Sequence, residues 1–206
     1  MKRAAPIEVT PEDSAKHRIL AATLRLVAAE GLDAVRHRRV ADMAEVSLGL
    51  TTYHFASRDR LIEEAFGLYL EESAAFLHRL EDRRTSTGSP SVRIVDFIAE
   101  LLSREFRTPA VIQAEYELIL YAGRNHRLAA RLARWEADQR ANIEQKLRSA
   151  GADQPADAAR TLWTLVRGLE LERLLNPGRQ LNLRRRLLPV VEALLAQRAA
   201  KGHGKK

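Results

Sequence analysis

The sequence predicts an all-α fold, and three observations carry this prediction. Apolar residues recur at spacings of three and four along most of the 206-residue chain, which is the period of one helix face. Alternation of apolar and polar residues, the pattern of a strand, is almost absent. Gly, Pro, Ser and Thr stand between the periodic segments, where helices start and stop. These patterns predict about nine helices and no sheet.

The N-terminal half contains four expected helices, at about 14–30, 37–44, 47–54 and 58–83. Ser14 and Ser57 precede the first and fourth of these, and a serine in that position caps a helix with its hydroxyl oxygen. Gly31 is expected to end the first helix. The segment 85–90, rich in Thr, Ser, Gly and Pro, is the one clear loop by composition.

The C-terminal half contains five more expected helices, at about 92–106, 109–121, 125–148, 155–174 and 182–199. Thr108 is expected to cap the sixth helix, with Pro109 in its first position. Pro155 opens the eighth helix in the same way. Pro189 either kinks the last helix or sets its effective start.

The segment 36–55 combines a short helix, a tight turn and a second short helix. Its apolar residues, with one from the next helix, have the spacing of a small shared core: Val40, Ala41, Ala44, Val46, Phe55 and Leu61. The polar and aromatic side chains between Ser47 and His54 must then point outward. A groove of duplex DNA would explain them, since a recognition helix offers its first turns to base edges. The segment is therefore interpreted as a helix-turn-helix.

The residues of this region resemble the TetR family of bacterial transcriptional regulators. The resemblance covers roughly the first third of the chain and rests on the order and spacing of Arg18, Ile19, Leu20, Ala22, Leu26, Glu30, Gly31, Val40, Ala41, Val46, Ser47, Gly49, His54, Phe55, Ser57, Arg58 and Leu61. It implies an N-terminal three-helix DNA-binding domain over 13–73, with its helix-turn-helix at about 36–55. A larger helical domain for effector binding and dimerisation would follow over 74–200. Residues 1–12 and 201–206 are expected to be flexible tails.

The chain departs from the family pattern at several positions. Val35 and Arg36 stand where the family commonly has Thr, so the usual hydroxyl cap of the second helix is missing. Glu45 replaces the usual turn glycine, which costs about 1 kcal/mol if the backbone is left-handed there. Leu48 and Leu50 occupy outward positions that are often polar in the family. Thr52 stands where the family often has Tyr, with Tyr53 next to it.

The resemblance implies a sequence-specific transcriptional regulator. We expect a ligand-responsive repressor that binds a palindromic operator in double-stranded DNA as a homodimer, paired through the last two helices, and that a small-molecule effector releases from DNA. A helical adaptor that binds protein without DNA specificity is an alternative. A DNA-binding activator is another, because nothing in the sequence decides the sign of regulation.

The expected contacts with DNA lie on the helix-turn-helix and just after it, at Arg36, His37, Arg38, Ser47, Leu48, Gly49, Leu50, Thr52, Tyr53, His54 and Arg58. Arginine, histidine and tyrosine side chains are expected to bind phosphates and so to set orientation. Arg38 is the exception, because an arginine in its position can bind guanine through two hydrogen bonds. Leu48 and Leu50 would touch thymine methyl groups, or Leu50 would lie in the small core.

The resemblance also implies a ligand cavity, framed by the helices between residues 61 and 163. Candidate lining residues are Phe66, Tyr69, Phe97, Leu101, Tyr116, Tyr121, Trp163 and Arg167. Aromatic residues at helical spacing are ordinary core residues in most helices. Four charged residues would need a partner or a function if they were buried, namely Glu115, Glu117, Arg167 and Glu170.

Composition and motifs exclude other functions. The net charge of +7 and a pI near 10.1 favour a polyanionic partner, although an even spread of Arg would give the same total. The chain has no cysteine, so it can form no disulfide or thiolate metal site. We find no histidine pair with metal-ligand spacing, no phosphate-binding loop and no serine elbow, so we expect neither enzyme activity nor a cofactor or metal. Without a signal peptide or a membrane span, a cytoplasmic location is expected.

Overall fold

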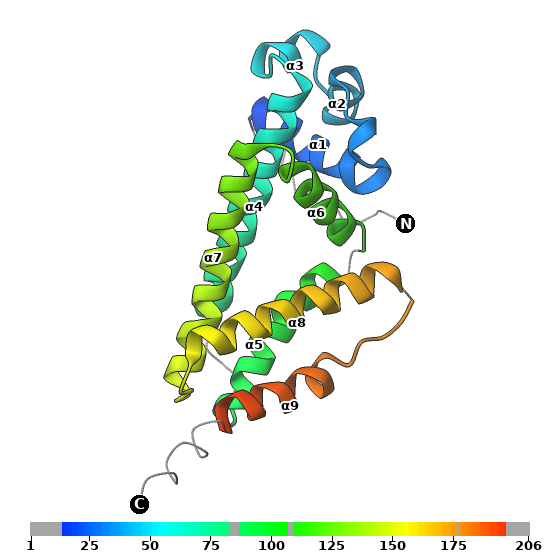
Figure 1. Ribbon diagram of the computed structural model, residues 1–206. Helices are drawn as coiled ribbons and strands as arrows, with labels where there is room; N and C mark the ends of the chain where they lie inside the picture. The colour runs from blue at the N-terminus through cyan, green and yellow to red at the C-terminus, as the bar shows by residue number, and fades with distance from the viewer. Residues whose placement is uncertain (1–13, 83–86, 107–108, 177, 197–206) are drawn as a thin grey trace, which may run out of the picture. The chain divides into compact units, whose positions relative to one another are not determined.

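The computed structural model describes residues 14–82, 87–106, 109–176 and 178–196. Over these residues the chain forms nine α-helices and one 3₁₀ helix, with no strand (Figure 1). Their bounds are α1 Ala15–Glu30, η1 Leu32–Ala34, α2 His37–Ala44, α3 Leu48–His54, α4 Arg58–Asp82, α5 Pro90–Phe106, α6 Pro109–Ala122, α7 His126–Ser149, α8 Pro155–Leu175 and α9 Leu183–Ala196. The all-α prediction is confirmed. The expected tails, the Thr108 cap and the first two residues of the 85–90 loop lie outside the described residues.

Side-chain caps fix several helix starts as the sequence predicts. The Ser14 hydroxyl oxygen accepts a hydrogen bond from the backbone N–H of His17 at 3.2 Å. Ser57 does the same for Arg60 at 3.2 Å at the start of α4. Each cap satisfies one of the donors that the first turn of a helix leaves free, which is worth about 1 kcal/mol. Gly31, with φ of 83°, ends α1.

Two local features differ from or refine the sequence prediction. The 3₁₀ helix η1 was not predicted, because three residues are too few to show a hydrophobic period. Pro189 lies inside α9, which begins at Leu183, so the proline does not set the start of the helix. α2 has Arg36 as its N-cap residue without a side-chain hydrogen bond, which confirms that the usual hydroxyl cap is missing.

The described residues separate into two compact units. Unit 1 consists of residues 14–78 and 109–134, so it contains α1, α2, α3 and α6 with most of α4 and the start of α7. Its largest fully buried side chains are Ile19, Leu24, Leu26, Phe55, Leu61, Ile62, Phe66, Ile112, Leu118 and Leu128. This core joins the helix-turn-helix to α1 and α4, and so gives α2 and α3 a fixed support.

Unit 2 consists of the described residues of 79–107 and 135–196, so it contains α5, the second part of α7, α8 and α9. The core of unit 2 includes Ile98, Leu102, Ile143, Leu162 and Leu187. α5 packs against both α8 and α9. The helices of this unit therefore share one apolar core.

The grouping of α6 differs from the expected division of the chain at residues 73 and 74. α6 follows the expected boundary in sequence, yet it packs against α1 in unit 1. A contact between helices so far apart in the chain leaves no local pattern that would predict it. The division into domains 13–73 and 74–200 stays a prediction about function, while the packing gives unit 1 the additional helix α6.

Candidate functional site

Backbone hydrogen bonds hold the turn between α2 and α3. Glu45 adopts the left-handed conformation, with φ of 55° and ψ of 47°. The N–H of Val46 donates to the Ala41 carbonyl at 3.1 Å, which closes the turn. A side chain in this conformation costs about 1 kcal/mol relative to glycine. The chain thus forms the turn in spite of Glu45.

Helix α3 is anchored on one side and open on the other. At its start, the Ser47 hydroxyl accepts a hydrogen bond from the Leu50 N–H at 3.1 Å. Thr51 and Phe55 are buried and fix the helix to the core of unit 1. Tyr53, in contrast, is 82% exposed. The helix therefore presents one side to solvent from a rigid support.

Most of the predicted DNA contacts lie in solvent. The exposed ones are Arg36, Arg38, Ser47, Leu48, Gly49, Thr52 and Tyr53, and the half-buried ones are His37, Leu50, His54 and Arg58. All of them belong to α2, α3 or the adjoining turns and N-termini, and Figure 1 shows these elements together in blue and cyan. The structure thus gathers the predicted residues on one small region of unit 1.

Arg36 and Arg38 differ from the neighbouring arginines in having no partner. Within the described chain, neither makes a hydrogen bond or an ion pair. Arg39, by contrast, donates to the Glu30 carboxylate at 2.6 Å. A guanidinium without an internal partner can bind a phosphate or a base edge without first breaking a bond.

Two of the predicted contacts are used inside the protein. The His37 Nε2 donates to the Phe55 carbonyl at 2.9 Å. The Arg58 side chain donates from Nε to the Val35 carbonyl at 3.0 Å and from Nη2 to the Leu32 carbonyl at 2.7 Å. These bonds hold the segment before α2 in place. A phosphate contact by His37 or Arg58 stays a prediction, and for Arg58 it would have to use the remaining nitrogen.

Gly49 is exposed near the start of α3, and the fold itself does not require a glycine there. A Cβ atom built at this position would meet only the Ser47 hydroxyl, at 3.9 Å. Glycine also lowers the stability of a helix by about 1 kcal/mol relative to alanine. The absence of a side chain at Gly49 therefore makes sense as room for a partner to approach the helix.

Helix α6 supports the segment that leads into the helix-turn-helix. The Glu117 carboxylate accepts a hydrogen bond from the Leu32 N–H at 2.6 Å, at the start of η1. The Tyr121 hydroxyl donates to the Asp59 carboxylate at 2.8 Å. Burial, and then this bond to Asp59, raises the pKa of Tyr121 to about 12. These polar contacts give α6 a defined place against α1, η1 and α4.

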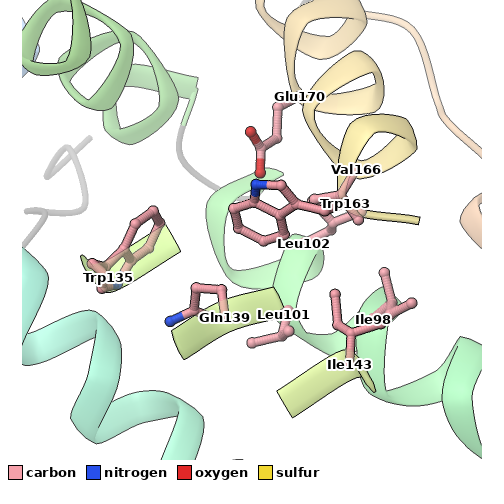
Figure 2. Close-up of a pocket in the computed structure, with 9 residues that line it drawn as sticks. All are labelled: Ile98, Leu101, Leu102, Trp135, Gln139, Ile143, Trp163, Val166 and Glu170. Atoms are coloured by element: carbon pink, nitrogen blue, oxygen red, sulfur yellow. The ribbon is translucent and has the colours of Figure 1, made fainter. Parts of the chain in front are cut away.

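Unit 2 contains a small cavity between α5, α7 and α8. Its volume is about 40 Å³, and its lining residues, drawn in Figure 2, are Ile98, Leu101, Leu102, Trp135, Gln139, Ile143, Trp163, Val166 and Glu170. Most of this lining is apolar. Two polar side chains, Gln139 and Glu170, are nevertheless buried there, with 7% and 3% of their surface exposed.

Arg167 lies beside this cavity, against the faces of two tryptophan rings. Its guanidinium carbon is 4.7 Å from the ring centroid of Trp163 and 5.5 Å from that of Trp135. It also donates to the Glu170 carboxylate at 2.8 Å and to the Glu136 carboxylate at 3.3 Å. Cation–π contacts and charge-assisted hydrogen bonds therefore surround one planar cation.

The predicted ligand residues divide between the two units. Leu101 and Trp163 line the cavity, and Arg167 stacks on two of its aromatic residues. Phe97 lies in the same unit, but outside the cavity, with the Lys146 ammonium 4.1 Å from its ring centroid. The remaining candidates, Phe66, Tyr69, Tyr116 and Tyr121, belong to unit 1. Tyr69 there donates to the buried Glu115 carboxylate at 2.7 Å.

Trp135 and Gln139 line the cavity but are not among the residues that the sequence predicts there. Both come from α7, where Trp135 has helical spacing with Leu128, Leu132, Ile143 and Leu147, and Gln139 is a polar residue in the same stripe. This spacing was the available signal. Glu170 is buried and pairs with Arg167, as expected for a charged residue that needs a partner inside the protein.

Two family models match the chain in separate regions. The model described as bacterial regulatory proteins of the tetR family matches residues 19–65. The model described as the tetracyclin repressor-like C-terminal domain matches residues 90–197, more than half of the chain. The chain belongs to the TetR family. No curated protein sequence matches it.

Several solved structures resemble the chain over most of its length. A transcriptional regulator from Rhodococcus sp. Rha1 is 21% identical, with a TM-score of 0.76 over 88% of this chain and 96% of that one. A transcriptional regulator from Streptomyces coelicolor A3(2) is 28% identical, with a TM-score of 0.68 over 89% and 99%. The multidrug binding protein EbrR in complex with ethidium is 27% identical, with a TM-score of 0.62 over 88% and 96%.

Membership of the TetR family makes the chain a transcriptional regulator rather than an enzyme. In the described part of the chain, no His, Asp and Glu side chains cluster in a way that could hold a metal ion. None of the helices described is both long and apolar enough to cross a membrane.

Proposed function

We propose that this TetR-family regulator is a repressor that binds a palindromic operator as a homodimer and that a small-molecule effector releases it from DNA. The observation that carries the proposal is the open side of α3, where exposed residues surround a glycine that the fold does not require. A rigid, short helix with this surface suits the major groove of DNA. Such a regulator acts in the cytoplasm, where the chromosome lies.

The proposed contacts separate into positioning and reading. Tyr53, His54 and Arg36 bind phosphates and set the orientation of α3 on the duplex. Arg38, which has no internal partner, reads guanine through two hydrogen bonds. Leu48, which is exposed, contacts a thymine methyl group. These roles follow from exposure and chemistry together.

The proposed dimer forms through α8 and α9. Leu171 and Leu175 lie four residues apart on α8, so they share one helix face, and Leu175 is 70% exposed. An apolar face of this kind is covered by the same face of a second copy in a two-fold dimer. Two copies of α3 then read two half-sites, about 34 Å apart on B-DNA.

The proposed effector site is the cavity of unit 2. EbrR, a multidrug binding protein solved in complex with ethidium, has a related fold at 27% identity. We propose that this chain likewise takes a small organic molecule, at the cavity lined by Trp135 and Trp163. The effector favours a dimer whose two α3 helices no longer match the spacing of the operator. DNA must weaken effector binding by the same factor.

A titration tests the proposed DNA specificity. The purified full chain is titrated against the DNA upstream of its own gene and against random duplex at matched salt. We expect tighter binding to the upstream DNA by about 10³-fold or more. Equal affinities would remove the regulator proposal, and no retention of either duplex at moderate salt would favour a protein-binding adaptor.

A further inference from the structure

The backbone of Leu32, the first residue of η1, is bonded on both sides to charged side chains of other helices. Its N–H donates to the Glu117 carboxylate of α6 at 2.6 Å. Its carbonyl oxygen accepts a hydrogen bond from Nη2 of Arg58, at the start of α4, at 2.7 Å. Hydrogen bonds to charged groups are about twice as strong as those between neutral groups. This one residue therefore joins η1 to α6 and to α4.

Side-chain burial fixes only one end of the segment between α1 and α2. Val35, the residue after η1, is fully buried. None of the three residues of η1 itself, Leu32–Ala34, is buried. A single 3₁₀ turn has poorer hydrogen-bond geometry than an α-helix and gives little stability of its own. The Leu32 end of the segment therefore depends on Glu117 and Arg58 for its position.

Gly31 allows the Glu117 carboxylate to come close to this backbone. A Cβ atom built at Gly31 would lie 3.1 Å from each oxygen of the carboxylate, which is closer than ordinary van der Waals contact. The φ of 83° at this position also favours glycine. The carboxylate thus lies against backbone that carries no side chain. Glycine and carboxylate together make the short bond to Leu32 possible.

The segment that begins at Leu32 leads directly into the helix-turn-helix. Arg58 also donates from Nε to the Val35 carbonyl at 3.0 Å, so it holds this segment at a second point. α2 starts at His37, and its N-cap residue, Arg36, makes no side-chain hydrogen bond to the described helix that would fix this start. α2 in turn packs against α3. A shift at Leu32 would therefore move the start of α2 and, with it, the orientation of α3.

We propose that Glu117 is a positioning residue for operator recognition. By holding the Leu32 N–H, it fixes the segment from which α2 starts, and so it sets the orientation in which α2 and α3 meet DNA. This inference rests on the proposed function, in which α3 reads the operator. Base contacts require an exact orientation, whereas sequence-independent attraction to phosphates does not. Glu117 therefore acts on the preference for the operator and not on the affinity for DNA in general.

Titration of the full chain with DNA tests this inference. The DNA upstream of its own gene and a random duplex are compared at matched salt, and the ratio of the two affinities is measured for each variant. Glu117→Ala removes the acceptor of the Leu32 N–H, so we expect this ratio to fall about tenfold. Glu117→Gln changes the charge equally but keeps an acceptor oxygen, so it should retain most of the ratio.

Glu71→Ala is the control for the loss of a carboxylate from unit 1. The Glu71 side chain is 73% exposed and pairs with Arg131 at 3.4 Å. Neither residue contacts η1, so the ratio of affinities should stay unchanged in this variant. All affinities are measured well below the temperature at which the least stable variant unfolds.

Hydrogen exchange at the Leu32 amide, followed by NMR, reports on the bond itself. Glu117→Ala should speed this exchange about tenfold relative to the wild type, whereas Glu71→Ala should not. If Glu117→Ala does not fold, Glu117→Asp takes its place, because it keeps the charge and draws the carboxylate back by one methylene group. We expect the same loss of operator preference from Glu117→Asp.

Three results would overturn the inference: an unchanged ratio of affinities in Glu117→Ala, an equal loss in Glu117→Gln, or an equal loss in Glu71→Ala. If the wild type itself prefers neither duplex, the proposed function fails and this inference fails with it. If the wild type prefers the upstream DNA and one of the three results is found, this inference fails alone.

Discussion

The open side of α3 and the cavity of unit 2 use polar groups in opposite ways. On α2 and its approach, Arg36 and Arg38 are exposed and make no hydrogen bond or ion pair with any residue that the structure describes, so both can bind a partner directly. Beside the cavity, the largely buried Arg167 guanidinium is paired with the carboxylates of Glu170 and Glu136. The α3 surface can therefore bind a partner directly. A ligand of the cavity, in contrast, must first replace contacts that protein side chains make with each other.

The largest expected effect comes from breaking the buried pair. Arg167→Ala removes the ion pair that Arg167 makes with the buried Glu170 carboxylate at 2.8 Å, so the free energy of unfolding should fall by about 3 kcal/mol. Urea denaturation followed by circular dichroism measures the change. Arg160→Ala is the control, because Arg160 pairs with Asp157 on the surface, and such pairs contribute less than about 1 kcal/mol. Equal losses in the two variants would show that the Arg167 pair is no different from a surface pair.

On the open side of α3, removal of an arginine side chain should alter the sequence specificity of DNA binding rather than the free energy of unfolding. Arg38→Ala should reduce discrimination at one base position by about 1 to 3 kcal/mol. Tyr53→Ala should weaken binding to all sequences alike, because a phosphate contact carries no sequence information. Titration against operator variants with single base changes, at one salt concentration, measures both. If Arg38→Ala weakened binding to all sequences and Tyr53→Ala reduced base discrimination, Tyr53 would contact the bases and Arg38 the phosphates.

The turn between α2 and α3 should become more stable when the left-handed residue Glu45 is replaced by glycine. Glu45→Gly should raise the free energy of unfolding by about 1 kcal/mol, because glycine adopts the left-handed conformation without cost. Glu45→Ala is the matched control, since it removes the charge and keeps the strain. Chemical denaturation compares the two. An equal gain in both would assign the effect of Glu45 to its charge instead.

Gly49→Ala should raise the stability of the protein and lower its affinity for DNA. Alanine fits the open space at Gly49 and raises helix stability by up to about 1 kcal/mol. The added methyl group should lower operator affinity by about tenfold if DNA approaches the helix there. Unfolding and DNA titration are measured on one preparation. Unchanged DNA affinity would place Gly49 outside the interface.

An effect that is absent at neutral pH concerns the pH dependence of unit 1. The pKa of Tyr121 is raised from 10.0 to about 12, so the folded protein holds this proton more tightly than the unfolded chain. The stabilisation is present below pH 10 and is lost as the pH rises from 10 to about 12. Tyr121→Phe removes this group, and denaturation across that range should show a shallower loss of stability in the variant. Identical pH profiles would contradict the assignment.

The fold and the reading helix could be predicted because their causes are local in sequence. The Ser14 and Ser57 caps, the glycine after α1 and the apolar spacing of 36–55 act within one or two turns of chain. The exception in this region is Glu117, which holds the start of η1 from 85 positions away. Such a contact has no counterpart in the local pattern.

The cavity could be predicted only in part. Leu101 and Trp163 belong to apolar stripes, so their burial follows from periodicity. Trp135 and Gln139 lie in the stripe of α7, but only the packing of α7 against α5 and α8 brings them to the cavity. Tyr121 was expected at the cavity for its aromatic ring, but its hydroxyl instead bonds to Asp59 in unit 1.

The two tryptophans of the sequence, Trp135 and Trp163, both line the cavity, edge to face with centroids 6.1 Å apart. The intrinsic tryptophan fluorescence of the protein therefore originates from this one place. Tryptophan fluorescence can therefore report occupancy of the cavity without any label. Helix α3 contains no tryptophan and does not contribute to this signal.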